Sequence, residues 1–149
     1  MFASTLPMDL LKLIEGFLVK YNPKKHTWGL LARAGNLQGL RWLHMNKIGG
    51  YTTDAMDWAA RNGHLEIVKW LHENRTEGCT TEAMNNAAMN GHLEVLKFLH
   101  ENRSEGCTID AMNCSAWGGH LEIVKFLHEN RAEGCTTRAM DWTALNGHL

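Results

Sequence analysis

Several features on which large classes of protein depend are absent from this sequence. No apolar run approaches the length of a membrane span. The apolar stretch near the N-terminus is interrupted by Asp9, Lys12 and Glu15 and has no basic start. A membrane helix and a secretory signal peptide are therefore not expected. We expect no membrane partner and an intracellular, cytoplasmic location, with the nucleus as the alternative.

The sequence also lacks a large excess of charge of either sign. The 15 Lys and Arg residues against 16 Asp and Glu residues leave a formal net charge of −1. The first 50 residues are basic, and the segments that follow are mildly acidic. Because nucleic-acid binding needs clustered cations, no nucleic-acid partner is expected.

No residue spacing typical of a metal site or a catalytic centre occurs. The nine His and four Cys residues form no C-x-x-C or H-x-x-x-H cluster. The glycines form no phosphate-binding loop, and nothing places a Ser, a His and an Asp together as a triad. We expect no catalytic residues, no metal site and no cofactor, and therefore no enzyme.

What the sequence does contain is a repeat of 28 residues. The unit C-T-T-E-A-M-N-N-A-A-M-N-G-H-L-E-V-L-K-F-L-H-E-N-R-S-E-G spans 79–106 and recurs with few changes at 51–78 and 107–134. A degenerate unit spans 23–50, and an incomplete one spans 135–149. A fixed period of this length is typical of a solenoid, in which each unit buries its apolar face against its neighbours. Such folds present long surfaces, so the repeat favours a binding protein.

Each unit contains two helical patterns. In 51–78 the first begins at Thr52, whose hydroxyl can accept a hydrogen bond in the first turn, and ends at Asn62-Gly63. Its apolar stripe consists of Ala55, Met56, Ala59 and Ala60. The predicted core face of the second pattern consists of Leu65, Val68 and Leu71, widened by Ile67 and Trp70. The segment 75–78 turns the chain back, so each unit is expected to be a helical hairpin with a short loop and no strand.

The motif R-N-G-H-L-E-I-V-K-W-L-H at 61–72 resembles the ankyrin repeat, whose units read T-P-L-H-x-A-A-x-x-G-H-L-E-V-V-K-L-L-L. The resemblance covers about 24–149. The chain departs from it at 54–57, which lacks the Pro, and in its unit of 28 residues against about 33. The missing residues fall where ankyrin proteins carry a β-hairpin finger. The resemblance implies an all-α, ankyrin-like solenoid of stacked helix-turn-helix repeats with shortened inter-repeat loops, which binds another protein.

Residues 1–22 precede the repeats and contain L-P-M-D-L-L-K-L-I-E-G-F-L at 6–18, which predicts an amphipathic helix with Pro in its first turn. One interpretation is a cap that covers the first unit. The motif also resembles the opening of an F-box, which docks onto the adaptor of a cullin ubiquitin ligase. In that case the protein would be a substrate-recognition adaptor whose repeats hold the target.

Positions that differ between otherwise matching units are candidates for partner recognition. In the first helix, three such positions lie on one face. They are Asp54/Trp58/Arg61, Glu82/Asn86/Met89, Asp110/Cys114/Trp117 and Arg138/Trp142/Leu145. By resemblance, ankyrin proteins bind on a concave face through the pair that precedes the turn glycine. These pairs are Arg61-Asn62, Met89-Asn90, Trp117-Gly118 and Leu145-Asn146.

Both arguments select a ladder of Arg61, Met89, Trp117 and Leu145. Within it, Trp117 is the expected anchor, and Arg61 is expected to face an acidic group. Trp58 and Trp142 are candidates for further contacts. The alternative is that these positions drift on an exposed surface and that both Trp side chains pack between units.

The histidines recur with the period at two places in the unit. One set follows the turn glycine and the other lies late in the second helix. The sets are His64, His92, His120 and His148, and His44, His72, His100 and His128. Because stacked helices lie about 8–10 Å apart, equivalent residues cannot share one metal ion, and hydrogen bonds to loops and helix ends are expected instead. The same spacing excludes disulfides among Cys79, Cys107 and Cys135.

Overall fold

The computed structural model describes residues 27–50 and 52–137, together with 139, 141, 144 and 147. The helices of this part are α2 (Thr27–Arg33), α3 (Leu37–Met45), α4 (Asp54–Arg61), α5 (Leu65–Asn74), α6 (Thr81–Met89), α7 (Leu93–Asn102), α8 (Ile109–Trp117) and α9 (Leu121–Asn130). No strand occurs among the described residues. The predicted all-α stack of helical hairpins is confirmed.

Some predictions concern other parts of the chain. The N-terminal helix expected at 6–18 lies outside the described residues, and so do Arg138, Trp142, Leu145 and Asn146. Among the residues that are described, no helix combines the length and the apolar character needed to cross a bilayer.

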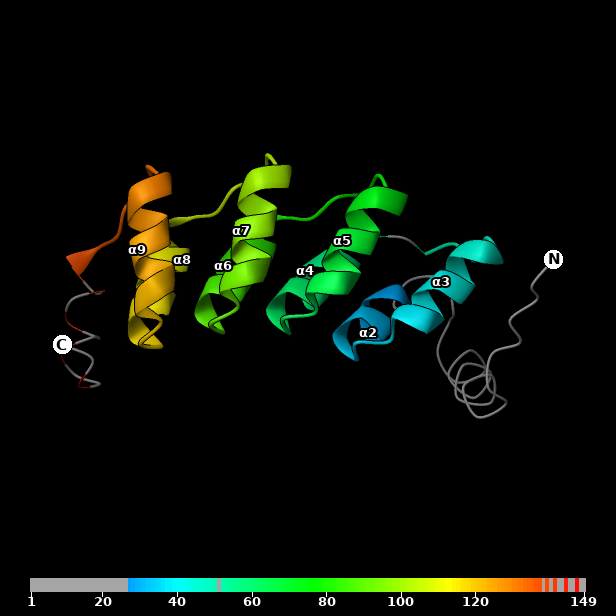
Figure 1. The fold of residues 1–149 in the computed structure, drawn as a ribbon, viewed down its shortest axis with the longest axis horizontal. Coiled ribbons are helices and arrows are strands. Elements are labelled where there is room, and N and C mark those ends of the chain that lie inside the picture. Colours follow the sequence, from blue (N-terminus) through cyan, green and yellow to red (C-terminus); the bar gives the residue numbers. More distant parts are fainter. Residues whose placement is uncertain are drawn as a thin grey trace.

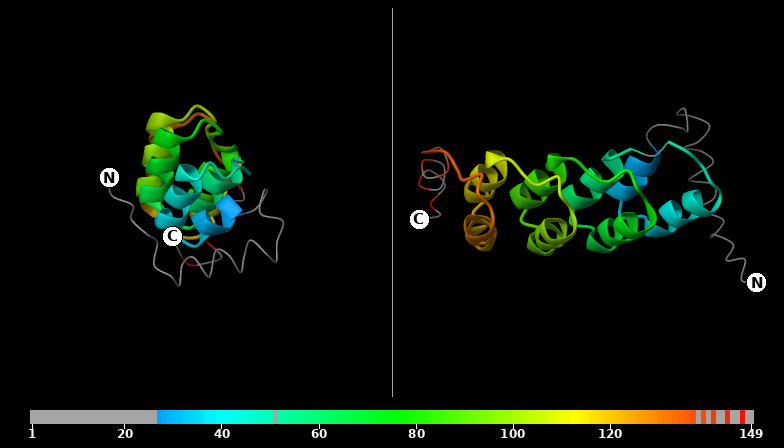
Figure 2. Two further views of the ribbon diagram at one scale, coloured as in Figure 1. Left: turned by 90° about the vertical axis from the view of Figure 1, so that its right-hand side faces the viewer. Right: turned by 90° about the horizontal axis from the view of Figure 1, so that it is seen from above.

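The helices form two layers (Figure 1). The first helices of the hairpins, α2, α4, α6 and α8, make one layer, and the second helices make the other. Seen from above, the layers are two parallel rows (Figure 2). Neighbouring first helices pack closely together, whereas neighbouring second helices contact one another much less.

Alanine allows the close approach of the first helices. The predicted apolar stripe of α4 is confirmed, since Ala59 and Ala60 are 0% exposed and Met56 is 2% exposed. Equivalent Ala and Met residues are buried in α6 and α8. The row of methyl groups brings the backbones together, and the methionines fill the space between the layers.

The predicted core face of α5 needs one correction. Ile67, Val68 and Leu71 are buried, whereas Leu65 is only partly buried. Leu65 is the first residue of the helix, and helical side chains lean toward the N-terminus, so this side chain extends past the helix end. The equivalent Leu121 is 61% exposed.

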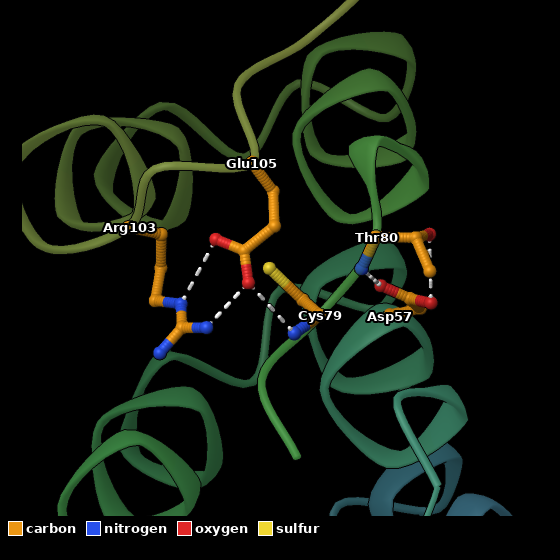
Figure 3. Close-up of polar contacts among 5 residues, drawn as sticks. All are labelled: Asp57, Cys79, Thr80, Arg103 and Glu105. Carbon is orange, nitrogen blue, oxygen red and sulfur yellow. Dashed lines mark hydrogen bonds and ion pairs between the residues drawn. The ribbon is translucent and has the colours of Figure 1, made fainter. Parts of the chain in front are cut away.

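The predicted start of α4 at Thr52 is wrong. The helix begins at Asp54, and its N-cap residue Thr53 forms no side-chain capping bond. In α6, by contrast, the Thr80 hydroxyl accepts from the N–H of Glu82 at 3.2 Å. Thr80 is itself held by the preceding unit, because its N–H donates to Asp57 Oδ1 at 2.8 Å (Figure 3).

We call this hydrogen bond, from a Thr N–H to the Asp or Asn of the preceding unit, the clasp. The later units are joined in the same way. The N–H of Thr108 donates to Asn85 Oδ1 at 2.9 Å, and that of Thr136 to Asn113 Oδ1 at 3.0 Å. Gly29 occupies the equivalent position before Thr52 and has no side chain to hold it. The missing clasp explains why the N-cap of α4 differs from those of α6 and α8.

The loops that follow α5, α7 and α9 are each closed by an Arg and a Glu two residues apart. The pairs are Arg75–Glu77, Arg103–Glu105 and Arg131–Glu133. In the central pair, Nε of Arg103 donates to Glu105 Oε2 at 3.2 Å, and a second N–H donates to Oε1. Glu105 also accepts from the N–H of Cys79 at 3.4 Å (Figure 3). The ion pair therefore ties one loop to the preceding one.

Candidate functional site

The C-terminal ends of the first helices lie along one edge of the stack. All first helices run in the same direction, so their turns into the second helices gather at the lower side of Figure 1. The last residues of α2, α4, α6 and α8 are Arg33, Arg61, Met89 and Trp117. We call this row of four residues the C-terminal edge.

The structure therefore places three of the predicted ladder residues on one edge and adds Arg33. Arg33 was missed because it belongs to the degenerate first unit. The available signal was its position, 28 residues before Arg61 and two before Gly35. The fourth predicted ladder residue, Leu145, is not among the described residues.

Exposure differs along the C-terminal edge. Arg33 and Arg61 are exposed, and Met89 is half-buried. The Trp117 side chain is 53% exposed, which is unusual for the largest apolar side chain. The edge therefore offers both charged and aromatic groups to a partner.

Trp58 packs across the boundary between the first two units. Its ring lies against Gly29 of the first unit, where a Cβ would meet the indole at 3.4 Å, an ordinary van der Waals distance. The guanidinium carbon of Arg33 lies 5.0 Å from the ring centre, and that of Arg61 lies 5.2 Å from it. The alternative given for Trp58, packing between units, is observed, and the same ring contacts two cations of the edge.

The asparagines beside the edge bond to their own helices. The side-chain amide of Asn62 donates to the carbonyl of Trp58 at 2.8 Å, and that of Asn90 to the carbonyl of Asn86 at 2.8 Å. Asn74 and Asn102 make the same bond at the ends of second helices. Helix termination therefore accounts for these residue types without a partner.

Histidines support the C-terminal edge from the following unit. Nε2–H of His64 donates to the carbonyl of Arg33 at 3.1 Å, that of His92 to Arg61 at 3.1 Å, and that of His120 to Met89 at 3.2 Å. The prediction that these histidines bond helix ends is confirmed. Burial lowers the pKa of His92, with smaller effects of the neighbouring His120 and His64, which favours the neutral ring.

The second set of histidines packs against aromatic rings. The rings of His72 and Phe98 meet edge-on at 5.6 Å, and those of His100 and Phe126 at 5.4 Å. Nδ1 of His72 and of His100 is buried without a hydrogen-bond partner. Among the described residues, no group of three or more His, Cys, Asp or Glu side chains is arranged to hold a metal ion.

The cysteines are free thiols, and the first two are buried. Burial, with a smaller effect of the nearby Glu105 carboxylate, raises the pKa of Cys79 to about 12. Burial also raises the pKa of Cys107. A thiol that stays protonated at neutral pH is a poor nucleophile and a poor metal ligand, so these residues serve in packing.

Comparison with known families agrees with this architecture. The family model described as ankyrin repeats (3 copies) matches residues 29–113 and 56–140. No curated protein matches the chain. The family match covers more than half of the sequence and includes all eight described helices except the first residues of α2. The chain belongs to the ankyrin-repeat family.

Proposed function

We propose that this protein is an interaction scaffold that binds a partner protein along the C-terminal edge of its first helices. Ankyrin repeats are generally modules for protein–protein interaction. The observation that carries the proposal is the exposed Trp117 at the end of α8, in a position that holds a different side chain in neighbouring units. Packing positions beside it repeat Ala and Met.

Trp117 is the anchor of this surface. Trp and Arg are the residue types most often found as interface hot spots, and the C-terminal edge contains both. Gly118 and Gly119 follow Trp117, so no side chain from the next two residues covers the indole. In the incomplete unit, Leu145 would continue the edge, with Trp142 beside it and Asn146 after it.

The packing of the two layers supports this assignment. The first helices form the more closely packed layer, and we infer that the stack is concave on their side, where the edge lies. A concave surface can enclose more of a partner than a flat one. We infer that the function is binding without catalysis, which matches the usual role of the family.

The test is the affinity of the Trp117→Ala variant for a partner found by cross-linking and mass spectrometry. The variant should weaken binding by about 2 kcal/mol or more, roughly thirtyfold, with unchanged circular dichroism. Met45→Ala is a matched control, because Met45 is 74% exposed but lies in the second-helix layer. Unchanged affinity of Trp117→Ala, or an equal loss in the control, would refute the assignment.

The adaptor function remains a second hypothesis that depends on 6–18 alone. It predicts that the full chain retains a cullin adaptor in a pull-down, and that a Leu10→Asp/Leu11→Asp variant does not. If the native chain fails to retain the adaptor, the helix is left with the capping role only.

A further inference from the structure

One end of the C-terminal edge carries two cations around one aromatic ring. Arg33 and Arg61 come from successive first helices, and both guanidinium carbons lie within 5.2 Å of the centre of the Trp58 ring. Both Arg side chains are exposed, and Trp58 is half-buried. The indole therefore contacts two positive charges, one from each of two successive first helices.

Neither guanidinium forms an ion pair with any residue that the structure describes. The arginines of the loops behave differently, since Arg75, Arg103 and Arg131 each pair with a Glu. The lysines of the second helices, Lys69, Lys97 and Lys125, also pair with a Glu. The fold thus neutralises these cations, whereas Arg33 and Arg61, like Arg41 and Lys47, have no anion from the described residues.

Helix capping does not explain this pair fully. Cations are favourable at helix C-termini because of the helix dipole. However, the carbonyls of Arg33 and Arg61 already accept hydrogen bonds from His64 and His92. Two like charges held at one ring also repel each other, and this repulsion is relieved when an anion binds.

Charge changes along the edge. Residues 27–50 contain three Lys or Arg and no Asp or Glu, and the two positions after Arg61 on the edge are Met89 and Trp117. The acids of α4 and α6 are Asp54, Asp57 and Glu82. Asp54 and Glu82 lie about 10 Å along the helix from the edge, and Asp57, about 6 Å from it, accepts hydrogen bonds from Thr80 of the next unit. The edge is therefore cationic at α2 and α4 and apolar at α6 and α8.

We infer that Arg33, Arg61 and Trp58 form a receptor for an acidic group of the bound partner, whose apolar residues lie on Met89 and Trp117. This inference rests on the proposed function and names the chemistry of its partner. Guanidinium groups bind carboxylates through paired N–H donors, and stacking on Trp58 limits the side-chain entropy lost on binding. The acidic and apolar groups of the partner should be about 10–20 Å apart, which is roughly 7–13 residues of a helix.

The test uses a fluorescein-labelled helical peptide of about 18 residues with two Glu at one end and Leu and Phe residues at the other. A second peptide carries Gln in place of both Glu. Titrations at about 0.15 M salt measure the dissociation constants of both peptides for the full chain. The native chain should bind the Glu peptide at least about tenfold more tightly than the Gln peptide. Equal binding of the two peptides, or no binding of the Glu peptide, would overturn the inference.

Protein variants locate the effect. Arg33→Gln/Arg61→Gln should weaken binding of the Glu peptide about tenfold or more and change binding of the Gln peptide less than about twofold. Arg33→Lys/Arg61→Lys keeps the charge but loses the paired donors, so it should be intermediate. Arg41→Gln/Lys47→Asn removes the same charge from α3 and the turn after it, and should leave the preference for Glu intact. Circular dichroism verifies the fold of each variant.

A loss of preference in the Arg41/Lys47 control as large as in the Arg33/Arg61 variant would mean unspecific attraction and contradict the inference. The natural partner separates the two proposals. If Trp117→Ala weakens binding of that partner and Arg33→Gln/Arg61→Gln does not, the edge binds the partner but the inference of a receptor for an acidic group is wrong. If neither variant weakens binding of the partner, both proposals fail.

Discussion

At the scale of single residues, the clasp between units shows how one side chain affects the stability of the boundary between two repeats. Asp57 accepts from the N–H of Thr80 at 2.8 Å and from its hydroxyl at 3.0 Å (Figure 3). Asn85 and Asn113 occupy the same place in the next units and use neutral amides. Burial raises the pKa of Asp57 even though the hydrogen bonds from Thr80 lower it. The charged residue is therefore the less favourable choice at this position.

The Asp57→Asn variant should be more stable than the native chain at pH 7, by about 0.5–1 kcal/mol. The folded-state pKa of Asp57 lies above its unfolded value, so the ionisation of this residue lowers the free energy of unfolding as the pH rises through the folded-state pKa. The gain should therefore be present at pH 7 and vanish below about pH 4. Urea titration at both pH values measures it. A variant that is less stable at pH 7 would show that the charge strengthens the clasp.

Sequence reasoning failed at residues whose role depends on a neighbour in space. The Thr capping residues were found from their type, but Thr52 was not distinguished from Thr80, because the missing side chain is at Gly29 in a degenerate unit. From the sequence, the Arg and Glu of each loop were assigned only to a turn. Their closeness in the sequence makes an ion pair between them predictable, but nothing predicts that Glu105 also accepts from the N–H of Cys79, 26 residues earlier.

At the scale of elements, the loops are held by ion pairs as well as by the core. The side chain of Arg103 is 21% exposed and that of Glu105 is 24% exposed. Hydrogen bonds from Arg103 lower the pKa of Glu105 to about 2. Those from Arg75 and Arg131 lower the pKa of Glu77 and of Glu133. These three loops therefore contribute stability that depends on an ionised carboxylate.

Acid should weaken these loops in a defined range. The folded-state pKa of Glu105 lies below its ordinary value of 4.5, so its contribution is present above pH 4.5 and is lost as the pH falls toward 2. Glu105→Gln should lower the melting temperature at pH 7 and show a smaller drop between pH 4.5 and 2 than the native chain. Glu101→Gln, on the exposed face of α7, is the control. Parallel pH profiles of Glu105→Gln and the native chain would contradict the role of the ion pair.

The helix pairs themselves were predictable, because the glycine period and the apolar stripes define them locally. The turn glycines have positive φ, as at Gly63 with φ 73°, and a Cβ there would lie 2.6 Å from the ring of His92. The same period predicted that equivalent residues at the ends of the first helices form a row along the stack. What the period could not supply was the use of each side chain, such as the bonds of Asn62 and Asn90 to their own helices.

At the scale of the whole molecule, stability should be distributed along the stack. The extensive contacts among the described helices lie within a hairpin or between neighbouring hairpins, as nearest-neighbour coupling requires. Leu99 is 0% exposed in α7, so Leu99→Ala should reduce the free energy of unfolding by about 2–5 kcal/mol. Hydrogen exchange should show the largest loss of protection in 79–106 and a smaller loss in 27–50. An equal loss throughout would indicate one cooperative core.

The central claim, that a partner lies along the C-terminal edge, is tested most directly by a footprint. Amide hydrogen exchange is measured on the chain alone and on its complex with the partner that cross-linking has identified. The account predicts new protection at the turns that follow Arg33, Arg61, Met89 and Trp117, and none at the opposite loops around Glu77 and Glu105. Protection confined to those loops or to the second helices would contradict it.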